Sequence, residues 1–285
     1  MSVKVLAQKS QVLLGEKSLK FIVFADLHYN REKYTEETPR KLCHLAGPVL
    51  DQLIADVKNE SLDFVACLGD IVQDEKVRKN NLSNLQTMLE KIKGFGVPAY
   101  YAIGNHDITA IGEKKLKEVF GKKSLSYSVD IDGVHLIFLG LRLESADWDG
   151  YSDGYLPKED FKWLKADIAK TNAPCIIFSH YSLFDDDMTG NYWFEGHKNE
   201  ALLDNREDFI EILKGKNVLA YFAGHQHWTR YINAGNCTAY VVGSMTENMH
   251  FDNKPDGVYF LVETDGKKIN VIEKRVNLEK NICNE

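Results

Sequence analysis

Five apolar runs in this sequence end abruptly in polar side chains, and this recurrence constrains the fold more than any other feature. Each run is long enough for one strand and closes on aspartate, asparagine or histidine. The runs are FIVFADLH (residues 21–28), DFVACLGD (63–70), PAYYAIGNHD (98–107), PCIIFSH (174–180) and VLAYFAGHQH (218–227). Apolar runs without polar alternation are typical of strands that are buried on both faces, as in sheets covered by helices. In such sheets ligands bind at the carboxyl ends of the strands, which is where all five clusters fall.

The segments between these runs predict helices and hairpins. We expect helices over residues 39–58, 81–93, 113–120, 157–170 and 205–214. Residues 124–130 and 134–139 flank an Asp132-Gly133 turn, and residues 231–276 indicate several antiparallel strands. A short strand is also expected over residues 2–14. Alternating strands and helices followed by hairpins predict a mixed sheet structure that helices cover.

The composition excludes some classes of function. The 285 residues are 44% hydrophobic and 27% charged, as in ordinary globular proteins, and the net charge of −7 disfavours binding of a long nucleic acid. A phosphate substrate remains compatible with this charge, because bound cations can reverse the local field. No apolar run of about 18 residues occurs, so we expect no membrane association, and a cytoplasmic protein if the chain is full length. Without a linker or repeat, we expect one domain over residues 1–285. The oligomeric state is left open.

The polar clusters contain the residue types of a metal site. Asp26 and His28 stand two residues apart, as do His225 and His227, so in an extended backbone each pair would point to one side. The candidate ligands offer oxygen and imidazole nitrogen atoms and no sulfur. They are Asp26, His28, Asp70, Asn105, His180, His225 and His227. This donor set favours Mn, Fe, Zn or Co over copper(I) or an iron–sulfur cluster. The five scattered cysteines contain no CxxC pair, so neither a disulfide framework nor a thiolate zinc site is indicated.

The ordered motifs D-x-H, GD, GNHD, H and GHxH resemble those of the calcineurin-like metallophosphoesterase superfamily over residues 21–245. The resemblance implies a four-layer αββα sandwich, with two mixed β-sheets face to face, helices outside and two metal ions at the strand ends. It implies one ion held by Asp26, His28 and His227, a second held by Asn105, His180 and His225, and Asp70 as the bridge. It also implies that His106 contacts the substrate, stabilising the phosphoryl charge or protonating the leaving oxygen, with Asp107 as its orienting partner.

Two adjacent cations would supply the chemistry of phosphoester hydrolysis. Ions about 3.5–4 Å apart can stabilise the attacking and leaving oxygens, and one ion can lower the pKa of a bound water from 15.7 to about 7. We therefore expect a metal-bound hydroxide to attack phosphorus, with Mn, Fe or Zn as the metals. A non-catalytic metal-binding interaction module on the same fold is the alternative. Such a scaffold should lack ligands or His106, and none of these residues is missing.

Differences between this chain and the motifs of particular subgroups of the family limit the classes of substrate that we expect. Purple acid phosphatases have a tyrosine three residues after the bridging aspartate, where this chain has Gln73. Protein Ser/Thr phosphatases resemble GDxVDRG, where residues 69–75 read GDIVQDE. The remaining resemblance is to cyclic-nucleotide phosphodiesterases and to ADP-ribose or CDP-alcohol diphosphatases, although the latter have D-x-Q-Y where this chain keeps His28. We expect a phosphodiesterase or diphosphatase acting on a small nucleotide-like molecule, with phosphomonoester hydrolysis as the alternative.

Two aromatic segments near the motifs are candidates for substrate contact. Residues 144–156 and 182–199 together contain Trp148, Tyr151, Tyr155, Phe184, Tyr192, Trp193 and Phe194. We expect Tyr192 or Trp193 to stack on a base, with Tyr29 and His197 as further candidate contacts. The alternative is a small hydrophobic cluster beneath a long loop.

Overall fold

The structure is a computed structural model that describes residues 18–31, 40–74, 80–143, 154–235 and 237–278. The strand expected over residues 2–14 and the aromatic residues Trp148 and Tyr151 lie outside these ranges.

The first sheet has five strands in the order β13-β12-β1-β2-β3. Its parallel part consists of β1 (Leu19–Phe24), β2 (Phe64–Cys67) and β3 (Ala99–Tyr101). β12 (Val258–Thr264) runs antiparallel to β1, and β13 (Ile269–Arg275) runs antiparallel to β12.

The second sheet has six strands in the order β10-β11-β9-β8-β5-β4. The strands are β4 (Tyr127–Ile131), β5 (Val134–Phe138), β8 (Cys175–Phe178), β9 (Val218–Ala223), β10 (Arg230–Asn233) and β11 (Thr238–Val241). The four central strands β5, β8, β9 and β11 are parallel to one another. The edge strands β4 and β10 run antiparallel to β5 and β11, respectively. The antiparallel strands expected over residues 231–276 are present in the pairs β10–β11 and β12–β13, and β11 also pairs in parallel with β9. A separate two-stranded ladder joins β6 (Arg142–Leu143) and β7 (Gly154–Tyr155).

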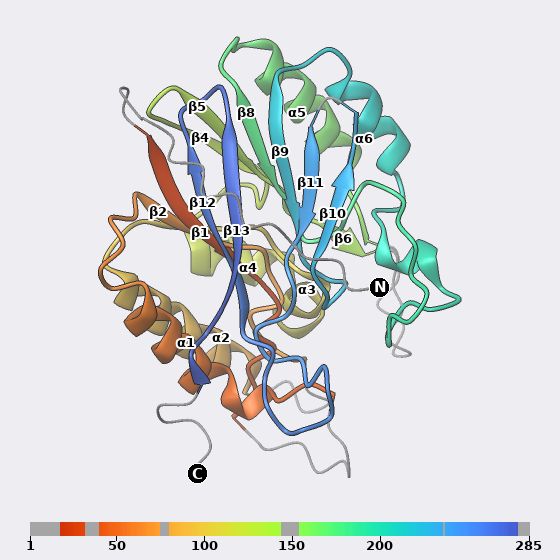
Figure 1. The fold of residues 1–285 in the computed structure, drawn as a ribbon. Helices are drawn as coiled ribbons and strands as arrows, with labels where there is room; N and C mark the ends of the chain where they lie inside the picture. Colours follow the sequence, from red (N-terminus) through yellow and green to blue (C-terminus); the bar gives the residue numbers. More distant parts are fainter. Residues whose placement is uncertain (1–17, 32–39, 75–79, 144–153, 236, 279–285) are drawn as a thin grey trace, which may run out of the picture.

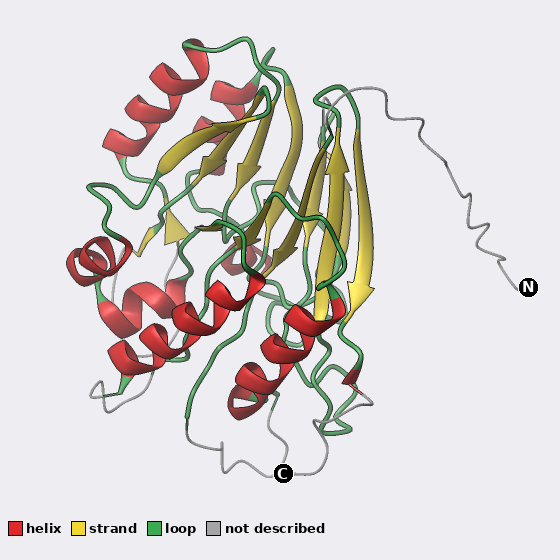
Figure 2. Cartoon of the chain, turned by 90° about the vertical axis from the view of Figure 1, so that its left-hand side faces the viewer, coloured by secondary structure: helices red, strands yellow, loops and turns green. Residues whose placement is uncertain are grey.

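Helices cover both outer faces of the paired sheets (Figures 1 and 2). The helices are α1 (Ala46–Asp56), α2 (Asn81–Ile92), α3 (Asn105–Ile111), α4 (Glu113–Phe120), α5 (Lys158–Ala169) and α6 (Arg206–Leu213). Short 3-10 turns occur at Cys43–Leu45, Lys93–Phe95 and Lys198–Ala201. None of the helices in the described part of the chain has the length and apolarity to cross a membrane.

Strand alternation explains the layers. Along β1, Phe21 and Val23 point into a buried layer between the two sheets, while Ile22 and Phe24 pack against α1 and α2. A third layer packs α5 and α6 on the outer face of the second sheet, around Tyr221. Three apolar layers between four layers of secondary structure confirm the expected αββα sandwich of two mixed sheets.

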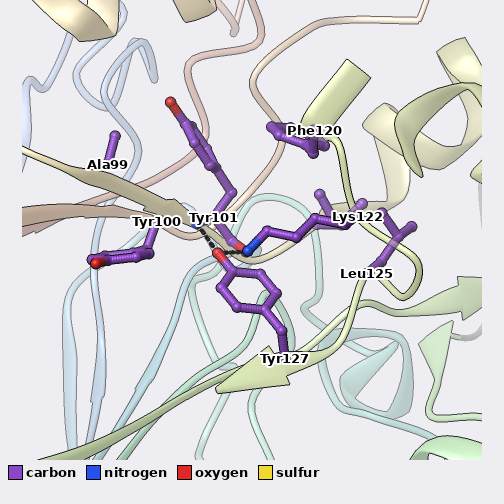
Figure 3. Close-up of a pocket in the computed structure, with 8 residues that line it drawn as sticks. Ala99, Tyr100, Tyr101, Phe120, Lys122, Leu125 and Tyr127 are labelled. Atoms are coloured by element: carbon purple, nitrogen blue, oxygen red, sulfur yellow. Dashed lines mark hydrogen bonds between the residues drawn. The ribbon is translucent and has the colours of Figure 1, made fainter. Parts of the chain in front are cut away.

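Two tyrosines join the edges of the two sheets. The Tyr101 amide on β3 donates to the hydroxyl of Tyr127 on β4 (2.8 Å), and this hydroxyl donates to the Tyr101 carbonyl (3.2 Å). A pocket of about 140 Å³ lies beside them, lined also by Phe120 and by Lys122, whose ammonium lies 3.7 Å from the centre of the Tyr127 ring (Figure 3).

One helix begins later than expected, and one helix is present that the sequence did not predict. The helix expected from residue 39 begins at Ala46, because the Leu42 amide donates to the Thr246 carbonyl (2.9 Å) and so takes part in a tertiary contact. Helix α3 was not expected, since Asn105 and His106 close an apolar run. The Asp107 carboxylate accepts from the Gly104 amide (3.2 Å), and this local cap starts a helix directly after the strand.

Candidate metal centre

The five polar clusters meet where the carboxyl ends of β1, β2, β3, β8 and β9 converge. Contacts across the two sheets fix this meeting, since His180 Nδ1 donates to the Leu68 carbonyl (2.8 Å) and the His225 amide donates to Asp26 (3.1 Å). The structure thereby brings the seven expected ligands together, on turns contributed by both sheets.

The backbone of these turns is left-handed, which corrects the expectation of extended pairs. Positive φ angles occur at Asp26 (57°), His28 (46°), Asp70 (49°), His225 (68°) and His227 (57°). Non-glycine residues adopt this region rarely, and such strained residues cluster at functional sites. The chain therefore turns sharply after β1, β2 and β9, and the paired side chains after β1 and β9 converge for this reason.

Two glycines allow the turns to approach one another. A Cβ atom on Gly104 would lie 2.1 Å from Asp70 Oδ1, and one on Gly69, which has a φ of 98°, would lie 2.3 Å from the Gly104 nitrogen. Only glycine fits at both places. Both glycines thus allow the turn at Asp70 and the turn before Asn105 to pack directly against each other.

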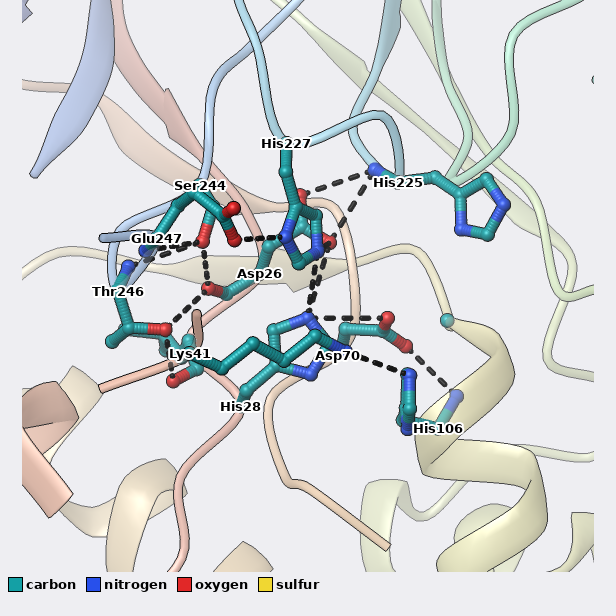
Figure 4. A network of polar contacts seen from close by, with 12 residues as sticks. Asp26, His28, Lys41, Asp70, His106, His225, His227, Ser244, Thr246 and Glu247 are labelled. Carbon is teal, nitrogen blue, oxygen red and sulfur yellow. Dashed lines mark hydrogen bonds and ion pairs between the residues drawn. The ribbon is translucent and has the colours of Figure 1, made fainter. Parts of the chain in front are cut away.

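The first group of donors is Asp26, His28 and His227, all buried (Figure 4). The Nε2 atoms of the two imidazoles lie 2.9 Å apart, and each lies within 3.8 Å of Asp26 Oδ1. Because His227 carries its proton on Nδ1, which donates to Glu247 (2.7 Å), its Nε2 atom presents a lone pair to this group.

The second group is Asp70, His180 and His225, with Asn105 beside it. His180 Nε2 lies 3.2 Å from Asp70 Oδ2 and 3.1 Å from Asn105 Oδ1. His180 donates through Nδ1 to a carbonyl, and His225 donates through Nε2 to the Glu200 carbonyl (3.0 Å). The remaining ring nitrogen of each histidine is thus free to coordinate a metal.

Asp70 lies between the two groups. Its Oδ2 atom is 3.6 Å from His28 Nε2 in one group and 3.2 Å from His180 Nε2 in the other, while the His106 amide donates to Oδ1 (2.9 Å). Burial would raise the pKa of Asp70, but the neighbouring His180 and His106 outweigh it and lower this pKa well below its usual range. A carboxylate held ionised between two donor groups fits a bridging ligand.

The buried charges of the site fit bound cations. Asp26 and Asp70 are almost completely buried, and among the described residues neither forms an ion pair with lysine or arginine. Burial raises the pKa of Asp26, and burial lowers that of His28 well below its usual range. Buried carboxylates need compensating charge, and imidazoles that resist protonation are ready metal ligands.

His106 lies beside the two groups, and its partner is not the one expected. Its Nδ1 atom forms an ion pair with Asp74, and the Gln73 amide nitrogen lies 3.2 Å from the same atom. Asp107 instead accepts the backbone amides of Ile71 (2.9 Å), Val72 and Gly104. Burial and the nearby Asp70 raise the pKa of Asp107 to about 7. Asp107 thus holds the turn after Asp70 against α3 and does not contact the His106 imidazole.

Sequence reasoning missed Glu247, a completely buried carboxylate that accepts from His227 Nδ1 and pairs with Arg40. A signal was present, because β11 is a sixth strand that ends in glycine and polar residues, with Ser244, Thr246 and Glu247 following it. Ser244 and Thr246 both donate to the Asp26 carbonyl (2.8 and 3.3 Å), so this segment supports the first group of donors.

The four candidate substrate contacts lie in different surroundings. Tyr29 is half-buried and packs on the apolar layer beneath α1 and α2, while His197 is exposed and lies 3.4 Å from Glu200. Tyr192 is 59% exposed. Trp193 is half-buried, donates through Nε1 to Glu247 (3.3 Å) and lies with its ring centre 5.8 Å from that of His227. Trp193 also packs with Met188, Phe194 and Trp228, so the expected alternative of a small apolar cluster under the loop is present.

Comparison with known proteins decides the family. The model of the calcineurin-like phosphoesterases matches residues 19–229. The chain belongs to this family. Two metal ions are accordingly its cofactors, and the two groups of donors that share the region of Asp70 are where this chain would hold them.

Relatives and solved structures agree with this membership. A protein of Psychrobacter arcticus described as a probable cyclic nucleotide phosphodiesterase is 23% identical over 233 residues, 74% of this chain and 77% of its own. The fold is similar to that of a dimetal phosphatase from Danio rerio (TM-score 0.69, 16% identity, 89% and 98% of the two chains). It is also similar to the purple acid phosphatase PPD1 of yellow lupin (TM-score 0.65, 14% identity, 94% of this chain and 53% of that one).

Proposed function

We propose that this calcineurin-like phosphoesterase hydrolyses a phosphodiester or diphosphate bond in a small nucleotide-like molecule. The observation that carries the proposal is the meeting of seven oxygen and imidazole donors in two groups, with Asp70 between them and His106 alongside. The description of the Psychrobacter relative supports a nucleotide-like substrate.

Each part of the site has a separate task in this proposal. When bound, the two ions stabilise negative charge on phosphate and lower the pKa of a bound water. The imidazole of His106, oriented by its contact with Asp74, stabilises the phosphoryl group or, when both ring nitrogens are protonated, gives a proton to the leaving oxygen. Glu247 and Leu68 fix the rings of His227 and His180, so that their Nε2 atoms face the ions.

Metal analysis combined with a turnover assay tests the proposal. We expect the Mn²⁺-loaded protein to bind two ions per chain and to hydrolyse bis(p-nitrophenyl) phosphate, and a panel of cyclic nucleotides and dinucleoside diphosphates then defines the natural class. Two bound ions without turnover on the whole panel would support a non-catalytic metal-binding module instead. Phosphomonoester hydrolysis is the second candidate, because the cationic Lys41 contacts His106.

A further inference from the structure

Lys41 lies at the metal centre although no motif includes it. Its backbone pairs with Glu247 in an antiparallel bridge, and this contact anchors the segment before α1 to the loop after β11. From there its ammonium reaches His106, with Nζ 3.2 Å from Nε2 (Figure 4), and lies 4.9 Å from the centre of the Trp193 ring. Lys41 therefore stands between the expected substrate-facing histidine and the aromatic loop.

The contact with Lys41 assigns the proton on His106. An ammonium group can only donate, so whenever the ring is neutral His106 Nε2 accepts from it and the ring proton lies on Nδ1. This is the atom that pairs with Asp74, which can only accept when ionised. In this arrangement the N–H donor at the Nε2 side of His106 is the ammonium of Lys41 and not the imidazole itself.

Among the described residues, Lys41 forms no ion pair with a carboxylate. The two nearby acids have other partners, since Asp74 pairs with His106 and Glu247 pairs with Arg40 and His227. No carboxylate in the described ranges forms an ion pair with Lys41, whose contacts there are a ring nitrogen and an aromatic face. An ammonium held in this way is available to an incoming anion.

We propose that Lys41 binds a negatively charged phosphate oxygen that the metal ions do not hold, and so selects substrates with a second negative charge. That charge lies on the reacting phosphoryl group of a monoester dianion or on the neighbouring phosphate of a diphosphate. A simple diester has one charge only, which the ions neutralise. This inference rests on the proposed function, and among its candidate substrates it favours a diphosphate or a phosphomonoester over a simple phosphodiester.

Two substrates that share a leaving group but differ in the charge of the phosphate separate the effect of that charge from the effect of the leaving group. p-Nitrophenyl phosphate is a dianion and p-nitrophenyl methyl phosphate is a monoanion. We expect Lys41→Met to lower kcat/KM for the dianion about 10- to 100-fold, the usual worth of a hydrogen bond to a charged group, and for the monoanion less than about threefold. Lys41→Arg should restore most of the loss. Equal losses on the two esters, or no loss on these esters and none on a dinucleoside diphosphate, would overturn the inference.

A dinucleoside diphosphate distinguishes the two sources of charge. A loss on the monoester alone would place Lys41 at the reacting phosphoryl group, because the reacting phosphate of a dinucleoside diphosphate carries one charge only. A loss on the diphosphate would place Lys41 at the neighbouring phosphate. Lys122→Met is the matched control, because Lys122 also lies over an aromatic ring but belongs to the separate pocket at β3 and β4. We expect it to leave all three rates unchanged.

Phosphate binding tests Lys41 without turnover. We expect calorimetry to show about tenfold weaker binding of inorganic phosphate to metal-loaded Lys41→Met than to the metal-loaded wild type, at equal metal content. Equal phosphate affinities would refute the role of Lys41. If the wild type hydrolyses no phosphoester, the proposed function fails, but this binding difference still decides whether Lys41 is an anion-binding residue.

Discussion

Glu247 accepts a hydrogen bond from His227, with Oε2 2.7 Å from Nδ1. Burial would raise the pKa of Glu247, but His227 and Arg40 outweigh it and keep this pKa below its usual value. The ionised carboxylate thus fixes the ring so that Nε2 faces Asp26 and His28. Partners of this kind orient metal-binding histidines and raise their basicity, and their loss usually costs 10- to 100-fold in metal affinity.

Replacing Glu247 should therefore weaken one metal site selectively. We expect Glu247→Gln to bind one of two Mn²⁺ ions about 10- to 100-fold more weakly while the second affinity changes little, as measured by calorimetry. Asp160→Asn is the matched control, since Asp160 is a buried carboxylate that accepts from Ser126 (2.7 Å) at the start of α5. Unchanged affinities in Glu247→Gln would contradict the assignment of His227 as a ligand.

Asp70 should matter more than any ligand of a single ion. One carboxylate between the two groups would serve both ions and screen their mutual repulsion. We expect Asp70→Asn to lose more bound metal and more activity than His225→Ala, which removes a donor from the second group alone. Elemental analysis of both variants measures this difference. Two ions per chain with activity near wild type in Asp70→Asn would exclude the bridge.

Apolar runs that end in polar residues predicted a mixed sheet structure covered by helices, and the resemblance to a known family implied the four-layer sandwich. The sequence also predicted which side chains meet, since Asp26 and His225 follow β1 and β9, whose carboxyl ends converge. The left-handed backbone that brings these side chains together could not be predicted from the spacing of the residues in the sequence. Left-handed backbone at His28 and His227 is imposed by contacts between turns, such as the bond from the His28 amide to the Asp70 carbonyl (2.8 Å).

The residues around the ligands could be predicted less well. Glu247, Asp74 and Lys41 reach the site from loops, and their roles depend on contacts with residues far away in the chain. Such contacts leave no periodic pattern in the sequence. The roles given to His106 and to the seven ligands, and the single domain expected over residues 1–285, stay predictions that the experiments described here and domain truncation would test.

His106 should be needed for the reaction and not for metal binding. We expect His106→Ala to keep two ions per chain and to lose about 10²- to 10⁴-fold in rate, the usual worth of a positioned proton transfer. The loss should be larger for an alkoxide leaving group than for p-nitrophenolate, which needs no proton. Asp74→Asn should show the same dependence with a smaller loss, because Asp74 only orients the ring. Loss of metal from His106→Ala would make this residue a ligand instead.

Tyr192 and Trp193, the two candidate stacking residues of the 182–199 loop, should behave differently. Tyr192 is exposed, with the Arg40 guanidinium 4.6 Å from its ring centre, and we expect it to stack on a base. Tyr192→Ala should then lower kcat/KM for nucleotide substrates about 5- to 150-fold and leave bis(p-nitrophenyl) phosphate unaffected. Trp193 donates to Glu247, so Trp193→Ala should reduce the rates on both substrates. A loss confined to nucleotides in Trp193→Ala would assign the stacking role to Trp193.

The colour of an iron-loaded form tests whether the set of ligands is complete. In purple acid phosphatases a tyrosine follows the bridging aspartate by three residues, and here that place is taken by Gln73, whose amide nitrogen lies 3.2 Å from His106. Tyr181 is a tyrosine beside the second group, and its ring stacks on that of His225 with ring centres 3.9 Å apart. We therefore expect the Fe³⁺-loaded protein, at two metal ions per chain by elemental analysis, to lack the strong visible tyrosinate-to-iron band. A purple preparation would show that a tyrosine coordinates the metal, and loss of the colour in Tyr181→Phe would identify it.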